Sequence, residues 1–114
     1  MIEFVTNPVV EVINDQWNVI RSDFIVKYYD YTLIVPKGFS TDFASVPRIP
    51  IVFTLFANKA KKSAVLHDWL YTTKPFSREE CDKAFLCAME AEGLNWVTRQ
   101  AMYRGVRLGG ALHY

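Results

Sequence analysis

The sequence predicts an α+β fold, with a small antiparallel β-sheet in the first third and three helices in the second half. β-branched and aromatic residues are dense over about 1–36, and helix-boundary residues recur over about 59–109. A turn-rich motif loop, 37–58, separates the two regions. The 114 residues suffice for one modest hydrophobic core, so we expect a single domain over 1–114.

Four segments of the first third have the composition of strands. They cover 9–13, 17–20, 24–28 and 31–35. The last two flank Tyr29 and Asp30, which predicts a hairpin. Pro36 and Gly38 are expected to end the sheet, because proline has no N–H to donate and glycine favours turns. The loop that follows runs into an apolar stretch, 49–57, which is interpreted as core or, alternatively, as a surface for lipid or a partner protein.

Each predicted helix is marked by its boundary residues. The helices cover 59–72, 77 to about 93, and 96–108. Pro75 ends the first, and Ser77 with Glu80 forms a capping box at the start of the second. Asn95 caps the third, and Gly109 ends it. Short connections favour antiparallel neighbours.

Composition excludes several classes of protein. The formal net charge of +1 provides no field to recruit nucleic acid, so no nucleic-acid partner is expected. No apolar run approaches the roughly 20 residues of a membrane-spanning helix, and no signal peptide is recognisable.

Cys81 and Cys87 fall on one helix about 9 Å apart, too far for a disulfide, so we expect the chain to fold reduced in a host cytoplasm. The three tryptophans are interpreted as core residues.

The segment from His67 to Tyr71 is the best candidate for chemistry. On a helix, His67 and Tyr71 share a face, whereas Asp68 points about 100° away. The imidazole can take a proton from water, and the Asp68 carboxylate can hold a hard cation such as Ca²⁺. Asp82, on the next helix, is the candidate for orienting His67. If the two helices are antiparallel, the Tyr71 hydroxyl can bond the same carboxylate.

Each of these residues also has a purely structural interpretation. His67 can be a hydrogen-bonded core residue, and Asp68 can pair with a neighbouring lysine. Asp82 can interact favourably with the dipole at the N-terminus of its helix. Asp42 either caps a short helix or supplies a second carboxylate to the cation site. Arg48 either binds an anion or pairs with Asp42.

Two long motifs resemble a known family. The stretch VPKGFSTDFASVPR over 35–48, followed by AVLHDWLY over 64–71 and MYRGVR over 102–107, resembles the signature of a phage and prophage family, domain-of-unknown-function family 1353. The resemblance implies a bacteriophage or prophage source and implies no activity.

A shorter pattern resembles an enzyme site. His67, Asp68 and Tyr71, with Asp82 downstream, are similar to the catalytic helix pair of secreted phospholipases of the A-two type. That resemblance implies that His67 activates water, Asp68 binds Ca²⁺, and Asp82 and Tyr71 orient His67. The glycine-rich calcium loop and the disulfides of those enzymes are not recognisable in this sequence.

Two functions are therefore expected. The first is a bacteriophage protein of the virion or tail with a metal-assisted hydrolase site, acting on host envelope lipid or cell wall during entry or lysis. The alternative is a structural or accessory virion protein of the tail tip, baseplate or neck, in which the His-Asp-Tyr set is an internal polar network. Both make other phage structural proteins the expected partners.

Overall fold

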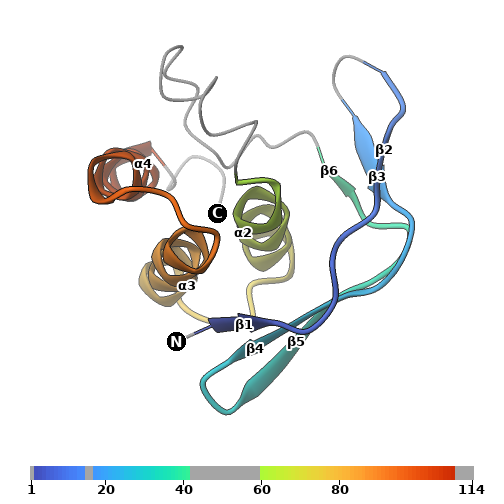
Figure 1. The fold of residues 1–114 in the computed structure, drawn as a ribbon, viewed down its shortest axis with the longest axis horizontal. Helices are drawn as coiled ribbons and strands as arrows, with labels where there is room; N and C mark the ends of the chain where they lie inside the picture. The colour runs from blue at the N-terminus through green and yellow to red at the C-terminus, as the bar shows by residue number, and fades with distance from the viewer. Residues whose placement is uncertain (1, 15–16, 42–59, 110–114) are drawn as a thin grey trace. The chain divides into compact units, whose positions relative to one another are not determined.

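The computed structural model describes residues 2–14, 17–41 and 60–109. The chain divides into two compact units, Met1–Asp42 and Phe43–Tyr114, and the strands fall in the first and the helices in the second. In these ranges, two small antiparallel sheets precede three helices, which confirms the α+β class, although the strands form two sheets where one was predicted (Figure 1). The single-domain organisation stays a prediction.

The first sheet contains the predicted hairpin. Its strands, in spatial order, are β1 (Ile2–Phe4), β4 (Phe24–Tyr28) and β5 (Tyr31–Val35). The hairpin register pairs Tyr28 with Tyr31, and Tyr29 in the turn has a positive φ of 52°. Alternate residues of β4 are buried, as expected of a strand with one covered face. The prediction of this hairpin is confirmed to the residue.

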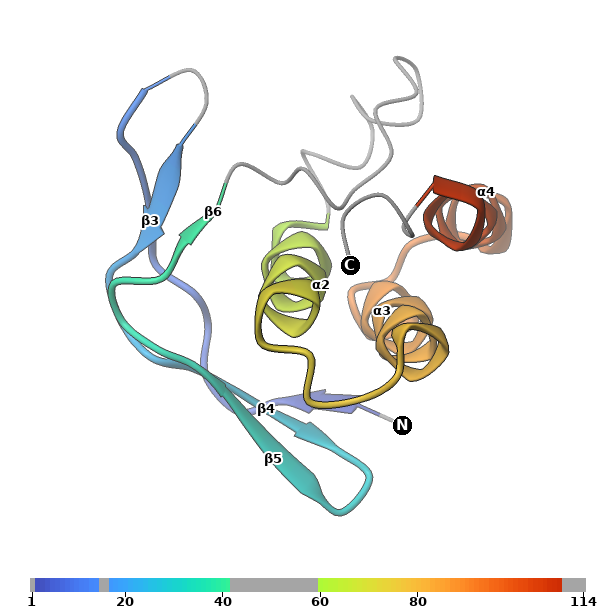
Figure 2. The same ribbon diagram turned by 180° about the vertical axis from the view of Figure 1, so that it is seen from behind.

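The second sheet contains one strand that was not predicted, as the first does with β1. It consists of β2 (Val10–Val12), β3 (Asn18–Ile20) and β6 (Ser40–Thr41), in that order. We expected 37–58 to be loop, but after a turn at Gly38, where φ is +94°, Ser40 pairs with Val19 and Thr41 with Asn18 (Figure 2). The strand is only two residues long and made of hydroxyl residues, so its composition resembles a turn.

The three helices begin and end within two residues of their predicted bounds. They are α2 (Lys61–Thr73), α3 (Arg78–Ala91) and α4 (Trp96–Gly109). The Ser77 hydroxyl accepts a hydrogen bond from the Glu80 N–H at 3.2 Å, which confirms the predicted cap of α3. Asn95 likewise accepts from the Thr98 N–H at 2.8 Å before α4. None of these helices is long and apolar enough to cross a membrane.

Neighbouring helices are antiparallel, as predicted. The Cys81 thiol near the start of α3 donates to the Leu70 carbonyl near the end of α2, whereas Glu92, just after α3, bonds Ser63 near the start of α2. Figures 1 and 2 show α3 between α2 and α4. A cluster of buried side chains joins the three helices. Its members are Ala60, Ala64, Phe85, Met89, Leu94, Met102 and Val106.

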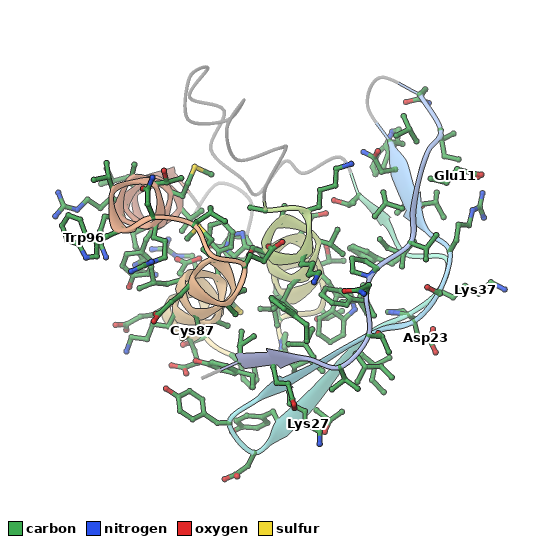
Figure 3. The ribbon with its side chains drawn as sticks, viewed as in Figure 1. Glu11, Asp23, Lys27, Lys37, Cys87 and Trp96 are labelled. Carbon is green, nitrogen blue, oxygen red and sulfur yellow. The ribbon has the colours of Figure 1, made fainter. Side chains whose placement is uncertain are left out.

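The cysteines follow the prediction, whereas the tryptophans do not. Cys81 and Cys87 form no disulfide, as predicted. The interpretation of all tryptophans as core is wrong, because Trp17 is 42% exposed and Trp96 is 61% exposed. Trp96 is the first residue of α4 and projects from its outer side (Figure 3), whereas the buried side chains of that helix are Met102 and Val106.

The start of α2 is capped by a residue of another helix, which gives a first testable prediction. Ala60 at the N-cap has no side chain for capping, and the Glu92 carboxylate accepts from the Ser63 N–H at 2.6 Å and from its hydroxyl at 2.5 Å. Loss of a cap costs up to about 2 kcal/mol. We expect Glu92→Ala to lower the free energy of unfolding by about 1–2 kcal/mol in urea denaturation. Exposed Glu90→Ala, on α3, is the control, and an equal loss in both variants would contradict the capping role.

Candidate functional site

The Asp82 carboxylate lies at the centre of the candidate site. Its Oδ1 atom is 2.9 Å from Nε2 of His67 and accepts a hydrogen bond from the Tyr71 hydroxyl at 2.5 Å. His67 and Tyr71 are one turn apart on α2, and Asp82 faces them from α3. The structure therefore brings together three residues that the sequence predicted as a set, in the arrangement that antiparallel helices were expected to produce.

Two arginines complete the surroundings of Asp82. Nη1 of Arg107, in the last turn of α4, donates to Oδ2 at 2.9 Å. Nη1 of Arg78, one turn before Asp82 on α3, is 3.8 Å from the same oxygen. Neither arginine was predicted from the sequence as a member of the site. The i,i+4 spacing of Arg78 and Asp82 was a local signal, whereas Arg107 is 25 residues away and reaches Asp82 only through helix packing.

The imidazole of His67 is fully enclosed, and only one of its two nitrogens contacts a hydrogen-bond partner among the described residues. The side chains of His67 and Asp82 are both 0% exposed. The ring stacks on Phe85 at a centroid distance of 4.3 Å and contacts the Tyr71 ring at the same distance. Its Nδ1 atom is buried and has no hydrogen-bond partner in the part of the chain that the structure describes. A buried polar atom without a partner is rare in native proteins and requires an explanation.

The contacts determine the protonation states of the site. Burial lowers the pKa of His67, although Asp82 and Asp68 act in the opposite direction, so the imidazole is neutral at pH 7. Burial alone would raise the pKa of Asp82, but hydrogen bonds from His67, Tyr71 and Arg107 outweigh it and lower that pKa. Burial and Asp82 raise the pKa of Tyr71, which stays a hydroxyl donor.

These states determine where the proton of His67 lies. An ionised carboxylate can only accept hydrogen bonds, so the nitrogen that faces Asp82 must carry the proton. Nε2 is then the donor to Oδ1, and Nδ1 carries a lone pair that meets no donor within 2–14, 17–41 and 60–109. The geometry thus presents a neutral imidazole whose basic nitrogen points away from the carboxylate that orients it.

The lowered pKa of His67 predicts a pH-dependent stability. In the unfolded chain the pKa of His67 has its ordinary value of 6.5, so below pH 6.5 the unfolded chain binds a proton that the folded chain does not. The contribution of His67 to the free energy of unfolding is therefore complete above pH 6.5 and is lost as the pH falls. We expect the midpoint of urea unfolding to fall between pH 8 and pH 5, and to fall less in His67→Gln. Burial raises the pKa of Glu92, so Glu92 stabilises the folded state as the pH falls. This opposite effect is the same in the wild type and in His67→Gln. Identical pH profiles for the two proteins would contradict the prediction.

The predicted cation site is only partly within the described residues. Asp68 is buried, at 8% exposure, and its backbone carbonyl accepts the Thr72 hydroxyl. Asp42 and Arg48 lie outside the described residues. Within 2–14, 17–41 and 60–109, no group of three or more His, Cys, Asp or Glu side chains is placed to hold a metal ion. Calcium takes six to eight oxygen ligands, so Asp68 alone makes no site, and calcium binding stays a prediction.

Comparison with known proteins identifies the family. The family model described as "Protein of unknown function (DUF1353)" matches residues 17–106, which is most of the chain. The chain belongs to this family. No curated protein matches it, and no solved structure does. The part matched to DUF1353 contains His67, Tyr71, Arg78 and Asp82. The predicted membership is confirmed, and the description gives no activity to assign to these residues.

Proposed function

We propose that this DUF1353 protein is a hydrolase in which His67 is the general base. The observation that supports this most directly is that the two nitrogens of one ring differ: Nε2 contacts Asp82, whereas Nδ1 has no hydrogen-bond partner among the described residues. This is the arrangement of a base whose far nitrogen is oriented by a third group. We further propose the setting expected from the motifs, a bacteriophage protein of the virion or tail that acts on host envelope lipid or cell wall.

The chemistry follows from the atoms of the site. Nδ1 accepts a proton from a water molecule as the water oxygen attacks the carbonyl carbon of an ester or amide. The imidazolium that forms is stabilised by Asp82, whose charge is held by Tyr71 and Arg107. The proton then passes from Nδ1 to the leaving oxygen or nitrogen as the bond to the carbonyl carbon breaks. Because His67 is 0% exposed, the groups that cover Nδ1 must move aside for water and substrate to enter.

The phospholipase-like pattern supports the same assignment. The resemblance implies that Asp82 and Tyr71 orient His67. In the structure His67 and Tyr71, four residues apart, both contact one oxygen of Asp82. The role of Asp68 in calcium binding rests on the chemistry of its carboxylate and on that resemblance, and Asp68 makes none of the contacts to Asp82 described above. The proposed reaction therefore includes no step through a metal, and calcium dependence is left to experiment.

The decisive variant is His67→Gln. The glutamine amide nitrogen can replace Nε2 as donor to Asp82, whereas nothing in glutamine replaces Nδ1. We expect hydrolysis by the variant to fall by about 10²-fold or more while its circular dichroism stays that of the wild type. The substrates are vesicles of phosphatidylethanolamine and phosphatidylglycerol, and purified peptidoglycan, each with calcium and with EDTA. Glu90→Gln, at an exposed position of α3, is the matched control.

The results separate the outcomes. Unchanged hydrolysis in His67→Gln would overturn the assignment of the base. Absence of hydrolysis by the wild type in all four conditions would overturn the hydrolase proposal for these substrates. Loss of activity only with EDTA would support the predicted cation.

A second candidate function is a non-catalytic virion protein, and one observation favours it. The side chains of His67 and Asp82 are both 0% exposed, which is the burial expected of a polar network that holds helices together. This candidate predicts that purified virions contain the protein in a fixed copy number, that the wild type hydrolyses neither substrate, and that His67→Gln lowers stability.

A further inference from the structure

The two arginines around Asp82 form a reciprocal link between α3 and α4. Nη1 of Arg78, on α3, donates to the carbonyls of Arg107 at 3.0 Å and Val106 at 3.4 Å, in the last turn of α4. Nη1 of Arg107 donates back to Asp82 on α3 at 2.9 Å. The last carbonyls of a helix have no partner within it, so a cation there is favourable. Arg78 thus hydrogen-bonds the backbone of Arg107, and the side chain of Arg107 in turn contacts Asp82.

The link acts on the orientation of the Asp82 carboxylate. Oδ1 takes both the His67 and the Tyr71 contacts, whereas Arg107 makes the short contact to Oδ2. A carboxylate bonded at both oxygens cannot rotate without breaking one set of bonds. Among the described residues, Arg107 also supplies the positive charge nearest to Asp82, which favours the ionised form that only accepts hydrogen bonds.

We propose that Arg107, held in place by Arg78, is a positioning residue that keeps the proton of His67 on Nε2 and so leaves Nδ1 as the base. Its effect on the tautomer follows from the hydrogen bonds alone, and its effect on rate rests on the proposed function. The side chain of Arg107 is 31% exposed, but the Asp82 side chain that it contacts is 0% exposed, so loss of Arg107 also removes a partner from a buried charge. A tautomer change without unfolding therefore distinguishes positioning from support of the fold.

Nitrogen NMR of the imidazole measures this tautomer directly. The chain has two histidines, so spectra of protein labelled with ¹⁵N-histidine contain few signals, and His67→Gln assigns those of His67. In the wild type we expect one protonated nitrogen, Nε2, and one unprotonated nitrogen, Nδ1. In Arg107→Gln both signals are expected to move toward each other as the second tautomer becomes populated, whereas Arg107→Lys retains most of the wild-type pattern.

The control isolates position from charge. Arg104→Gln makes the same charge change at an exposed position of α4 and is expected to leave both signals unchanged. Unmoved signals in Arg107→Gln, or equal movement in Arg104→Gln, would overturn the inference. If Arg107→Gln does not fold, Arg78→Gln takes its place, because it leaves Arg107 present but releases the last turn of α4. Unmoved signals in that variant would also overturn the inference.

The kinetic test is separate. On the substrate that the wild type hydrolyses, Arg107→Gln is expected to lower kcat by about 10–100-fold with KM unchanged, and Arg107→Lys to recover part of the loss. A shifted tautomer with unchanged kcat would overturn the kinetic role of Arg107. Absence of wild-type hydrolysis would count against the proposed function, while the NMR result would still decide whether Arg107 positions His67.

Discussion

Asp82→Asn is expected to lower the free energy of unfolding by about 3–5 kcal/mol, because it removes the acceptor shared by several donors. Asp82 is 0% exposed, and His67, Tyr71 and Arg107 all direct hydrogen-bond donors at its two oxygens. Asparagine has nearly the same shape but replaces one of those oxygens with an NH₂ group. If the amide nitrogen faces Arg107, a donor faces a donor. If it faces His67, Nε2 can accept only in the other tautomer, which leaves a buried Nδ1–H without a partner among the described residues.

Urea denaturation at pH 7 measures this loss. Asp30→Asn is the matched control, since Asp30 is exposed in the turn between β4 and β5, and it is expected to change stability by no more than about 0.5 kcal/mol. A loss below about 1 kcal/mol in Asp82→Asn would mean that the buried carboxylate is not the acceptor on which these contacts depend.

The sequence was sufficient to predict the inner part of this site because its signals are local. His67 and Tyr71 share a helical face by spacing alone, and the capping box at Ser77 fixes where the next helix begins. Once α2 and α3 are antiparallel, Asp82 can only face the same side. Helix periodicity, a cap and a short connection are together enough to bring these three residues into contact.

The outer part of the site could not be predicted in the same way. Arg107 reaches Asp82 across 25 residues, and the contact depends on how α4 packs on α3. Nothing in the sequence distinguishes Arg107, which turns toward Asp82, from Arg99, which bonds the Leu94 carbonyl, or from the exposed Arg104. Trp96 was mispredicted in the opposite direction. Its apolar ring led to the prediction of a core residue, but the residue is 61% exposed at the start of its helix.

The strands show the same limit. The hairpin of β4 and β5 has long alternating strands and a tight turn, and its bounds were predicted to the residue. Ser40–Thr41 forms a strand only because β3 offers it an unpaired edge, which is a property of the partner and not of the two residues. A long-range pairing of this kind leaves no periodic signal in so short a segment.

Phe85→Ala is expected to lower the free energy of unfolding by about 3–5 kcal/mol, because Phe85 belongs at once to the helical core and to the wall of the site. It is 0% exposed, is part of the buried cluster joining the helices, and stacks on the His67 ring at 26° and 4.3 Å. Phe85→Leu keeps most of the volume and is expected to lose less than about 2 kcal/mol while still removing the aromatic face. Urea denaturation measures both losses, and the ¹⁵N signals of His67 report on its ring in Phe85→Leu. Equal stability losses in the two variants, or signals of His67 that do not respond to loss of the stacked ring, would contradict a role for Phe85 in both core and site.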